Sequence, residues 1–266
     1  MDEPALIRMY AAEQSFANEL ADIAADIAVS YPAHALQVRS KDDLSPVTAA
    51  DAAIERALRA AVAGRFPRDG FLGEEEGASR DGKRMWVVDP IDGTRNFIDG
   101  IQIWAVLIAL VVDDRPVLGI IDSPGLRERY EAVRGQGARM NGVPIGVSTA
   151  KSVGEALVVH SGVEEWLAGP YWEGFERIAM KCRRTRGLSD FWGHMLVARG
   201  SADVLMEHEP CGLWDWAAVS VILEEAGGRI TTLDGEEPHG GCSLLSTNGA
   251  LHDEVLGLLH GERAGK

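Results

Sequence analysis

Cysteine is scarce in this sequence, and the three cysteines that occur lie far apart. Cys182, Cys211 and Cys242 form no C-x-x-C pair. Their spacing argues against a zinc site and against the disulfide framework that stabilises small secreted domains. Because free cysteines suit a reducing compartment, we expect a cytoplasmic protein.

Positive charge is also scarce. The chain has 26 lysines and arginines against 41 aspartates and glutamates, which gives a formal net charge of −15. Nucleic acids and anionic membranes are themselves negative, so this balance argues against both as main partners. We expect a small-molecule substrate instead. If that substrate carries phosphate, bound divalent cations would be needed to reverse the local field.

Long hydrophobic runs are missing as well. The longest, Ile103 to Val112, is far shorter than the roughly 20 residues that cross a bilayer. The first ten residues, MDEPALIRMY, carry acidic side chains where a secretion signal would carry basic ones. We therefore expect no membrane partner and no signal peptide, and we interpret residues 103–112 as a buried strand.

The length of 266 residues fits one large domain or two closely packed ones. Apolar residues recur at helical spacing over residues 5–30, and Thr48 is placed to cap a second helix with Asp51 in its first turn and Gly64 at its end. The other expected elements are strands at 71–72, 86–88, 116–121, 156–160 and 202–206, and helices at 190–198 and 215–226. We divide the chain into an α+β half, 1–150, that carries most candidate ligands and an α/β half, 151–266, packed together as one compact unit.

Three acidic clusters mark the candidate site. They are LGEEEG at 72–77, DPIDGT at 89–94 and LWDWAA at 213–218, and each follows an apolar run at a turn or a helix start. Taken singly, the glutamates could form a solvated loop, and Asp215 could simply cap a helix.

Together the clusters predict a magnesium site. Magnesium prefers oxygen ligands and usually takes one or two carboxylates with water and substrate phosphate. A strand end with Asp89 and Asp92, and with the carbonyl of Ile91 between them, supplies such ligands at short spacing. With Glu74 and Asp215 from other segments, this is the ligand set of two-metal phosphoryl chemistry, in which the ions lie ~4 Å apart.

The residues that follow Asp92 suit phosphate. Gly93 has no side chain, so a phosphate could approach the N–H groups of Gly93 and Thr94 at a helix start. Thr94 could also orient an attacking water. Haloacid-dehalogenase-type phosphatases place a nucleophilic aspartate in a D-x-D-x-T pattern, whereas this chain has D-x-x-D-x-T. The offset favours a metal-bound water over a covalent aspartyl phosphate.

With these motifs the chain resembles the magnesium-dependent inositol monophosphatase family. The matching segments are GEE at 73–75, WVVDPIDGTRNF at 86–97 and WDWAA at 214–218, with KDDLSPVTAAD at 41–51 upstream. The resemblance implies a layered α/β/α/β/α sandwich of the inositol monophosphatase and fructose-1,6-bisphosphatase type, a homodimer, sensitivity to lithium and two or three Mg²⁺ ions per site. It also implies metal ligands at Glu74, Asp89, Ile91 (carbonyl), Asp92 and Asp215, Lys41 near the metals, and water activation by Thr94 with Asp51 or Glu74.

Within this family, three segments look most like histidinol-phosphate phosphatases of actinobacterial type: SPVTAAD, DFWGHMLVARGSADVLME and PHGGCSLLSTNGALHDEVLGLL. The resemblance thus implies hydrolysis of histidinol phosphate to histidinol. Inositol 1-phosphate, another cyclitol phosphate, a sugar phosphate or a nucleoside monophosphate are alternative substrates, and a non-catalytic binding or assembly subunit is the alternative of another class.

Three acidic residues are candidates for contact with the alcohol. The family keeps a glutamate at a fixed interval before the last aspartate, but here Glu207 is one residue too far from Asp215 and Glu209 one too near. Asp190 could approach the substrate hydroxyls or could cap a helix that begins at Phe191. The sequence leaves these alternatives open.

Overall fold

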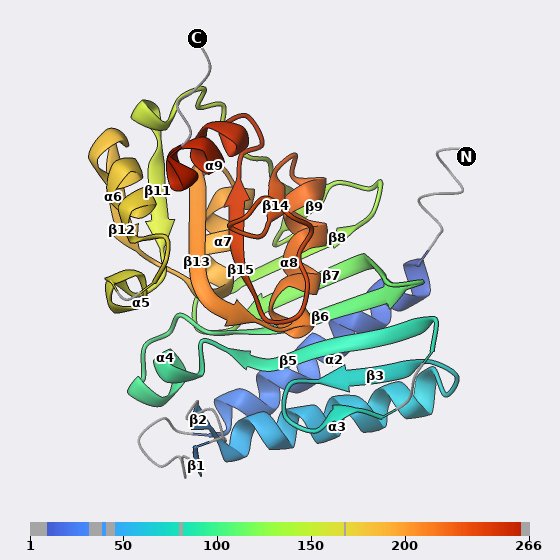
Figure 1. The fold of residues 1–266 in the computed structure, drawn as a ribbon. Coiled ribbons are helices and arrows are strands. Elements are labelled where there is room, and N and C mark those ends of the chain that lie inside the picture. The colour runs from blue at the N-terminus through green and yellow to red at the C-terminus, as the bar shows by residue number, and fades with distance from the viewer. Residues whose placement is uncertain (1–9, 32–38, 41–45, 80–81, 168, 262–266) are drawn as a thin grey trace.

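The computed structural model describes residues 10–31, 39–40, 46–79, 82–167 and 169–261 (Figure 1). The candidate Lys41 lies outside the described residues. So do residues 5–9 of the expected first helix.

Two long helices form the N-terminal part of the fold. Helix α2 spans Ala11–Val29 and α3 spans Ala49–Arg65, one residue past the expected end at Gly64. The Thr48 side chain accepts hydrogen bonds from the first turn of α3, and the Asp51 carboxylate accepts the Thr48 N–H in return. This capping box confirms the predicted helix start. Ahead of it, β1 (Arg39–Ser40) pairs with β2 (Pro46–Val47).

The first large sheet has eight strands in the order β10-β9-β8-β7-β6-β5-β3-β4. Its apolar strands 106–111 and 86–88 are buried on both faces because helices cover the sheet on either side. The strands are β3 (Gly70–Gly73), β4 (Gly77–Ala78), β5 (Arg84–Asp92), β6 (Ala105–Val112), β7 (Arg115–Ser123), β8 (Glu128–Val133), β9 (Ala138–Met140) and β10 (Val143–Pro144).

The second sheet has five strands in the order β12-β11-β13-β15-β14. These are β11 (Leu157–His160), β12 (Arg184–Gly187), β13 (Val204–Cys211), β14 (Arg229–Thr231) and β15 (Cys242–Thr247). The remaining helices are α4 (Thr94–Asp99), the short helix η2 (Val153–Glu155), α5 (Val163–Leu167), α6 (Trp172–Lys181), α7 (Asp190–Ala198), α8 (Leu213–Glu225) and α9 (His252–His260).

Three separate cores hold these elements in five layers (Figure 1). One core joins α2 and α3 to the large sheet, with Leu20, Ile54 and Trp86 among its buried residues. The central core places α7 and α8 between the two sheets. The third joins the small sheet to α6 and α9 on its outer face. The layering confirms the expected α/β/α/β/α sandwich.

The central core draws residues from both sides of residue 150. Each of the two sheets lies wholly on one side of that position, and the division into halves stays a prediction. Among the described residues, no helix is long and apolar enough to cross a membrane. The three cysteines are free.

Candidate active site

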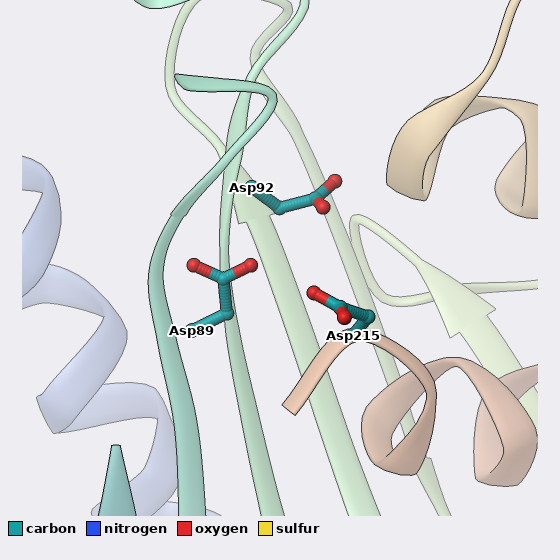
Figure 2. Close-up of side chains that lie close together, drawn as sticks. All are labelled: Asp89, Asp92 and Asp215. Carbon is teal, nitrogen blue, oxygen red and sulfur yellow. The ribbon is translucent and has the colours of Figure 1, made fainter. Parts of the chain in front are cut away.

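Asp89 and Asp92 lie where strand β5 leaves its regular pairing with β6. The register between the two strands shifts between these residues, so the backbone turns there. The Asp89 carboxylate accepts the Ile91 N–H at 3.0 Å. Such a break re-aims side chains, and here it brings both carboxylates to the same end of the strand (Figure 2).

Asp215 reaches the same place from helix α8. It is the third residue of the helix, and its carboxylate accepts the N–H of Gly212, so it does not occupy the N-cap position that the simpler alternative gave it. One oxygen from each of Asp89, Asp92 and Asp215 lies within 4.8 Å of the other two. Figure 2 shows these carboxylates facing one another, which confirms that the two motifs converge.

This convergence is electrostatically unfavourable without a cation. Burial, followed by the charges of Glu74, Asp92 and Asp215, raises the pKa of Asp89 well above its ordinary value. Burial and the charges of Asp190 and Asp215 do the same to the pKa of Asp92. Like charges in a desolvated cluster favour protonation or a bound cation.

Glu74 lies in the turn between β3 and β4. Its N–H donates to the carbonyl of Val88 at 3.2 Å, which ties this turn to the neighbouring strand β5. Its charge contributes to the raised pKa of both Asp89 and Asp51. Glu74 lines the same cavity as the three aspartates. The alternative in which the glutamates form only a solvated loop therefore does not hold for Glu74.

Asp51 is fully buried at the start of α3. One of its carboxylate oxygens accepts both the N–H and the hydroxyl of Thr48, whereas the buried Oδ1 has no hydrogen-bond partner in the described structure. Burial raises the pKa of Asp51 to about 6, and hydrogen bonds from Thr48 oppose the rise. An unpartnered buried oxygen beside Glu74 is suited to a water or a cation.

Gly93 and Thr94 form the turn into α4. Gly93 has φ 78°, and a Cβ there would lie 3.0 Å from the carbonyl oxygen of Ile103, so glycine suits both the backbone angle and the space. The Thr94 hydroxyl donates to the carbonyl of Ile91 at 2.8 Å. The carbonyl predicted as a metal ligand and the hydroxyl predicted to orient water are therefore adjacent.

The start of helix α7 faces the metal-site candidates. Its Phe191 N–H donates to Asp92 at 2.7 Å, and its Asp190 N–H donates to Glu207 at 3.2 Å. Asp190 itself is the first helical residue, with φ 55°. The expectation that Asp190 could cap a helix beginning at Phe191 is wrong, because carboxylates from two other segments receive these N–H groups.

Glu207 and Glu209 differ in their surroundings. Glu207 is only 6% exposed, and burial with the charges of Asp190 and Asp92 raises its pKa well above the ordinary value. Glu209 is exposed and lies 3.4 Å from Arg95. The pairing of β13 with β15 shifts between Glu207 and Cys211, which accommodates the irregular spacing seen in the sequence.

Except for the buried Asp51, these carboxylates line one cavity of about 470 Å³. Glu74, Asp89, Asp92 and Asp215 form what we call the inner carboxylates. The outer carboxylates are Glu164, Glu165, Asp190, Glu207 and Glu209. Among the described residues that line the cavity, Arg95 is the single arginine or lysine. This excess of carboxylates makes the cavity suited to metal ions and to a positively charged ligand group.

Comparisons with known proteins agree with this site. A model of the inositol monophosphatase family matches residues 10–263. The chain belongs to this family. It is 40% identical to a histidinol-phosphatase of Streptomyces coelicolor, covering 94% of this chain and 98% of that one. A histidinol-phosphatase of Mycobacterium tuberculosis is 41% identical, with 89% and 94% covered.

A solved structure shows the same fold. An inositol monophosphatase from Zymomonas mobilis superposes with a TM-score of 0.82 at 34% identity, covering 95% of this chain and 99% of that one. The family assignment confirms the predicted enzyme class, a phosphoric monoester hydrolase, and a metal-dependent site.

Sequence reasoning missed Glu164 and Glu165. They belong to the short helix α5, and the segment VEEW carries no motif that separates it from an ordinary polar helix start. Glu165 has a buried Oε2 without a hydrogen-bond partner, and burial raises the pKa of this carboxyl. Only the fold brings α5 to the wall of the cavity.

Proposed function

We propose that this protein is a Mg²⁺-dependent phosphatase that hydrolyses histidinol phosphate to histidinol. The observation that carries the proposal is that the inner and outer carboxylates line the same cavity. The inner group would hold metal and phosphate, and the outer group would receive the alcohol.

The inner carboxylates fit magnesium in their chemistry. They supply only hard oxygen ligands, and the clustered oxygens of Asp89, Asp92 and Asp215 leave room for water and phosphate to complete the coordination. The Ile91 carbonyl would add another oxygen. When bound, Mg²⁺ would neutralise the phosphate and promote ionisation of an attacking water.

The chain's own groups would orient the reactants. The N–H groups of Gly93 and Thr94 would bind a phosphate oxygen, and the Thr94 hydroxyl, held near the Ile91 carbonyl, would orient the water for in-line attack. Asp51 with a raised pKa, or Glu74 beside it, would accept the water proton.

The outer carboxylates favour a cationic alcohol over a neutral one. Histidinol is an amino alcohol that carries an ammonium group at neutral pH, whereas inositol is uncharged. Five carboxylates opposed by Arg95 alone would stabilise that ammonium and would offer a neutral cyclitol only hydrogen-bond acceptors. The histidinol-phosphatases of two bacteria, at 40% and 41% identity, support the same substrate.

The test is Mg²⁺-dependent phosphate release from histidinol phosphate, myo-inositol 1-phosphate, a nucleoside monophosphate and several sugar phosphates. We expect the highest kcat/KM for histidinol phosphate and no turnover with chelator. The highest kcat/KM for a neutral substrate would contradict the proposed alcohol. Absence of turnover on every phosphate ester would instead favour the alternative of a non-catalytic binding subunit.

Assembly and location belong to the same proposal. The family resemblance supports a homodimer, and three free cysteines suit the cytoplasm. Light scattering on the purified protein would distinguish a dimer from a monomer.

A further inference from the structure

A buried carboxylate outside the cavity supports the turn that carries Glu74. Glu55 lies on helix α3, one turn after Asp51, and its side chain is completely buried. Residues four apart share one helix face, so the helix that places Asp51 also directs Glu55 toward the large sheet.

Glu55 accepts hydrogen bonds from two consecutive residues of the β3–β4 turn. Its Oε2 accepts the N–H of Glu75 at 2.7 Å, and its Oε1 accepts the N–H of Glu76 at 3.0 Å. These are the two residues that follow Glu74. Charge-assisted hydrogen bonds of this kind are stronger than those between neutral groups, so they restrain the turn.

Arg59 completes the arrangement from the next turn of α3. Its guanidinium pairs with Glu55 and also donates to the carbonyl of Gly77 at 2.9 Å, at the far end of the same turn. Its Cζ lies 4.6 Å from the centroid of the Phe71 ring. The Glu55 charge is thus both paired and hydrogen-bonded, as a buried charge requires.

Gly73 allows the close approach. A Cβ at this position would lie 2.1 Å from Cδ of Glu55. Only glycine leaves space for the carboxylate beside the strand end that precedes Glu74. Gly73 and Glu55 therefore form one packed unit, and a change in either would displace the other.

From these contacts we infer that Glu55 is a positioning residue that fixes the 74–76 turn and presents Glu74 to the metal site. Glu55 is not among the residues that line the cavity. The inference rests on the proposed function, because it assigns Glu74 to Mg²⁺ binding. Groups that orient metal ligands typically change metal affinity by about 10- to 100-fold when they are removed.

The test is calorimetric titration of Mg²⁺ into purified wild-type protein and Glu55→Gln, with hydrogen exchange of the 74–76 turn measured in parallel. Glutamine keeps the size of the side chain but cannot accept both N–H groups and pair with Arg59. We expect Mg²⁺ affinity to fall about tenfold, exchange in this turn to accelerate, and kcat at saturating Mg²⁺ to change much less than the Mg²⁺ requirement.

Glu13→Gln is the matched control. Glu13 also pairs with an arginine, Arg84, but on helix α2 and outside the cavity. It should lower stability without changing Mg²⁺ affinity. Gly73→Ala is the second variant, which displaces the Glu55 carboxylate by a different route and should weaken Mg²⁺ binding in the same way if Glu55→Gln fails to fold.

If folded Glu55→Gln or folded Gly73→Ala bound Mg²⁺ as tightly as the wild type, the positioning role of Glu55 would be overturned, and the proposed function would be unaffected. If the wild type itself bound no Mg²⁺, the proposed function would be overturned and this inference with it. The two failures are therefore distinguishable in one set of titrations.

Discussion

The inner and outer carboxylates of the cavity are held by different kinds of structure. The inner aspartates are carried by a buried strand end and by the first turn of a long helix, both packed in large cores. The outer carboxylates are carried by a helix start with a left-handed residue, an irregular part of β13 and the short helix α5. Rigid elements suit metal ligands, whose geometry must be kept, whereas local irregularities can vary without disturbing the core.

The largest expected effect is at the inner group. Asp92→Asn replaces a ligand oxygen by an amide, which binds a hard cation poorly, so we expect Mg²⁺-dependent kcat/KM to fall by about 100-fold or more. The asparagine carbonyl can still accept the Phe191 N–H, so the fold should persist. Turnover assays, with circular dichroism as the control for folding, would check this. Unchanged turnover would remove Asp92 from the metal site.

At the outer group we expect a smaller and substrate-dependent effect. Glu207→Gln keeps an acceptor for the Asp190 N–H but cannot carry the negative charge that would stabilise a bound ammonium. The kcat/KM for histidinol phosphate should fall about tenfold, since hydrogen bonds to charged groups contribute ~1.5–3 kcal/mol. The rate on myo-inositol 1-phosphate should change less. Equal losses on both substrates would contradict selection by charge.

Glu209→Gln should have a weaker effect than Glu207→Gln. Glu209 and its partner Arg95 are both well exposed, and exposed ion pairs contribute at most about 1 kcal/mol. We expect kcat/KM for histidinol phosphate to fall by less than about fivefold, mostly through KM, with a visible dependence on salt. If Glu209→Gln lowered kcat/KM more than Glu207→Gln does, Glu209 rather than Glu207 would be the main contact of the alcohol.

The smallest expected effect concerns stability and pH. Burial raises the pKa of Asp51 to about 6, and burial with the neighbouring carboxylate charges raises the pKa values of Asp89 and Asp92 well above the ordinary value. These three groups therefore bind protons more tightly in the folded than in the unfolded chain. Their contribution to stability is present at low pH and is lost as pH rises through the folded pKa values. In chelator, we expect Tm to fall by about 3 °C or more between pH 6 and 8.

Saturating Mg²⁺ should abolish most of that decline, because the ion replaces the protons. Asp92→Asn in chelator is the control, and it should show a shallower decline. Differential scanning calorimetry at several pH values would measure both. A Tm in chelator that rises from pH 6 to 8 would show that this cluster does not control stability in that range.

The sequence named the four inner carboxylates and three of the outer ones, but neither Glu164 and Glu165 nor the contacts at the start of α7. The pattern DPIDGT placed Asp89, Asp92, Gly93 and Thr94 together because they follow one strand, and the capping signal at Thr48 located Asp51. The sandwich was implied by the family resemblance. By contrast, the N–H groups at the start of α7 are bound by distant residues. The Phe191 N–H donates to Asp92, 99 residues earlier, and the Asp190 N–H donates to Glu207, 17 residues later. No local pattern encodes such partners.

Glu55 illustrates the same limit. In the sequence it is one of several charged residues on an amphipathic helix, where a charge is usually exposed. Its role depends on the approach of Gly73 and on two backbone N–H groups 20 and 21 residues away. Local pattern is therefore a good guide to ligands on one strand end, but not to the groups that hold them in place.

The most direct test of the central claim is a crystal structure of the protein grown with Mn²⁺ in place of Mg²⁺, with an anomalous difference map calculated at the manganese edge. The account predicts at least one peak among the carboxylates of Asp89, Asp92 and Asp215, on the side that faces Glu74. A peak elsewhere, or none at this cluster when Mn²⁺ supports turnover, would contradict it.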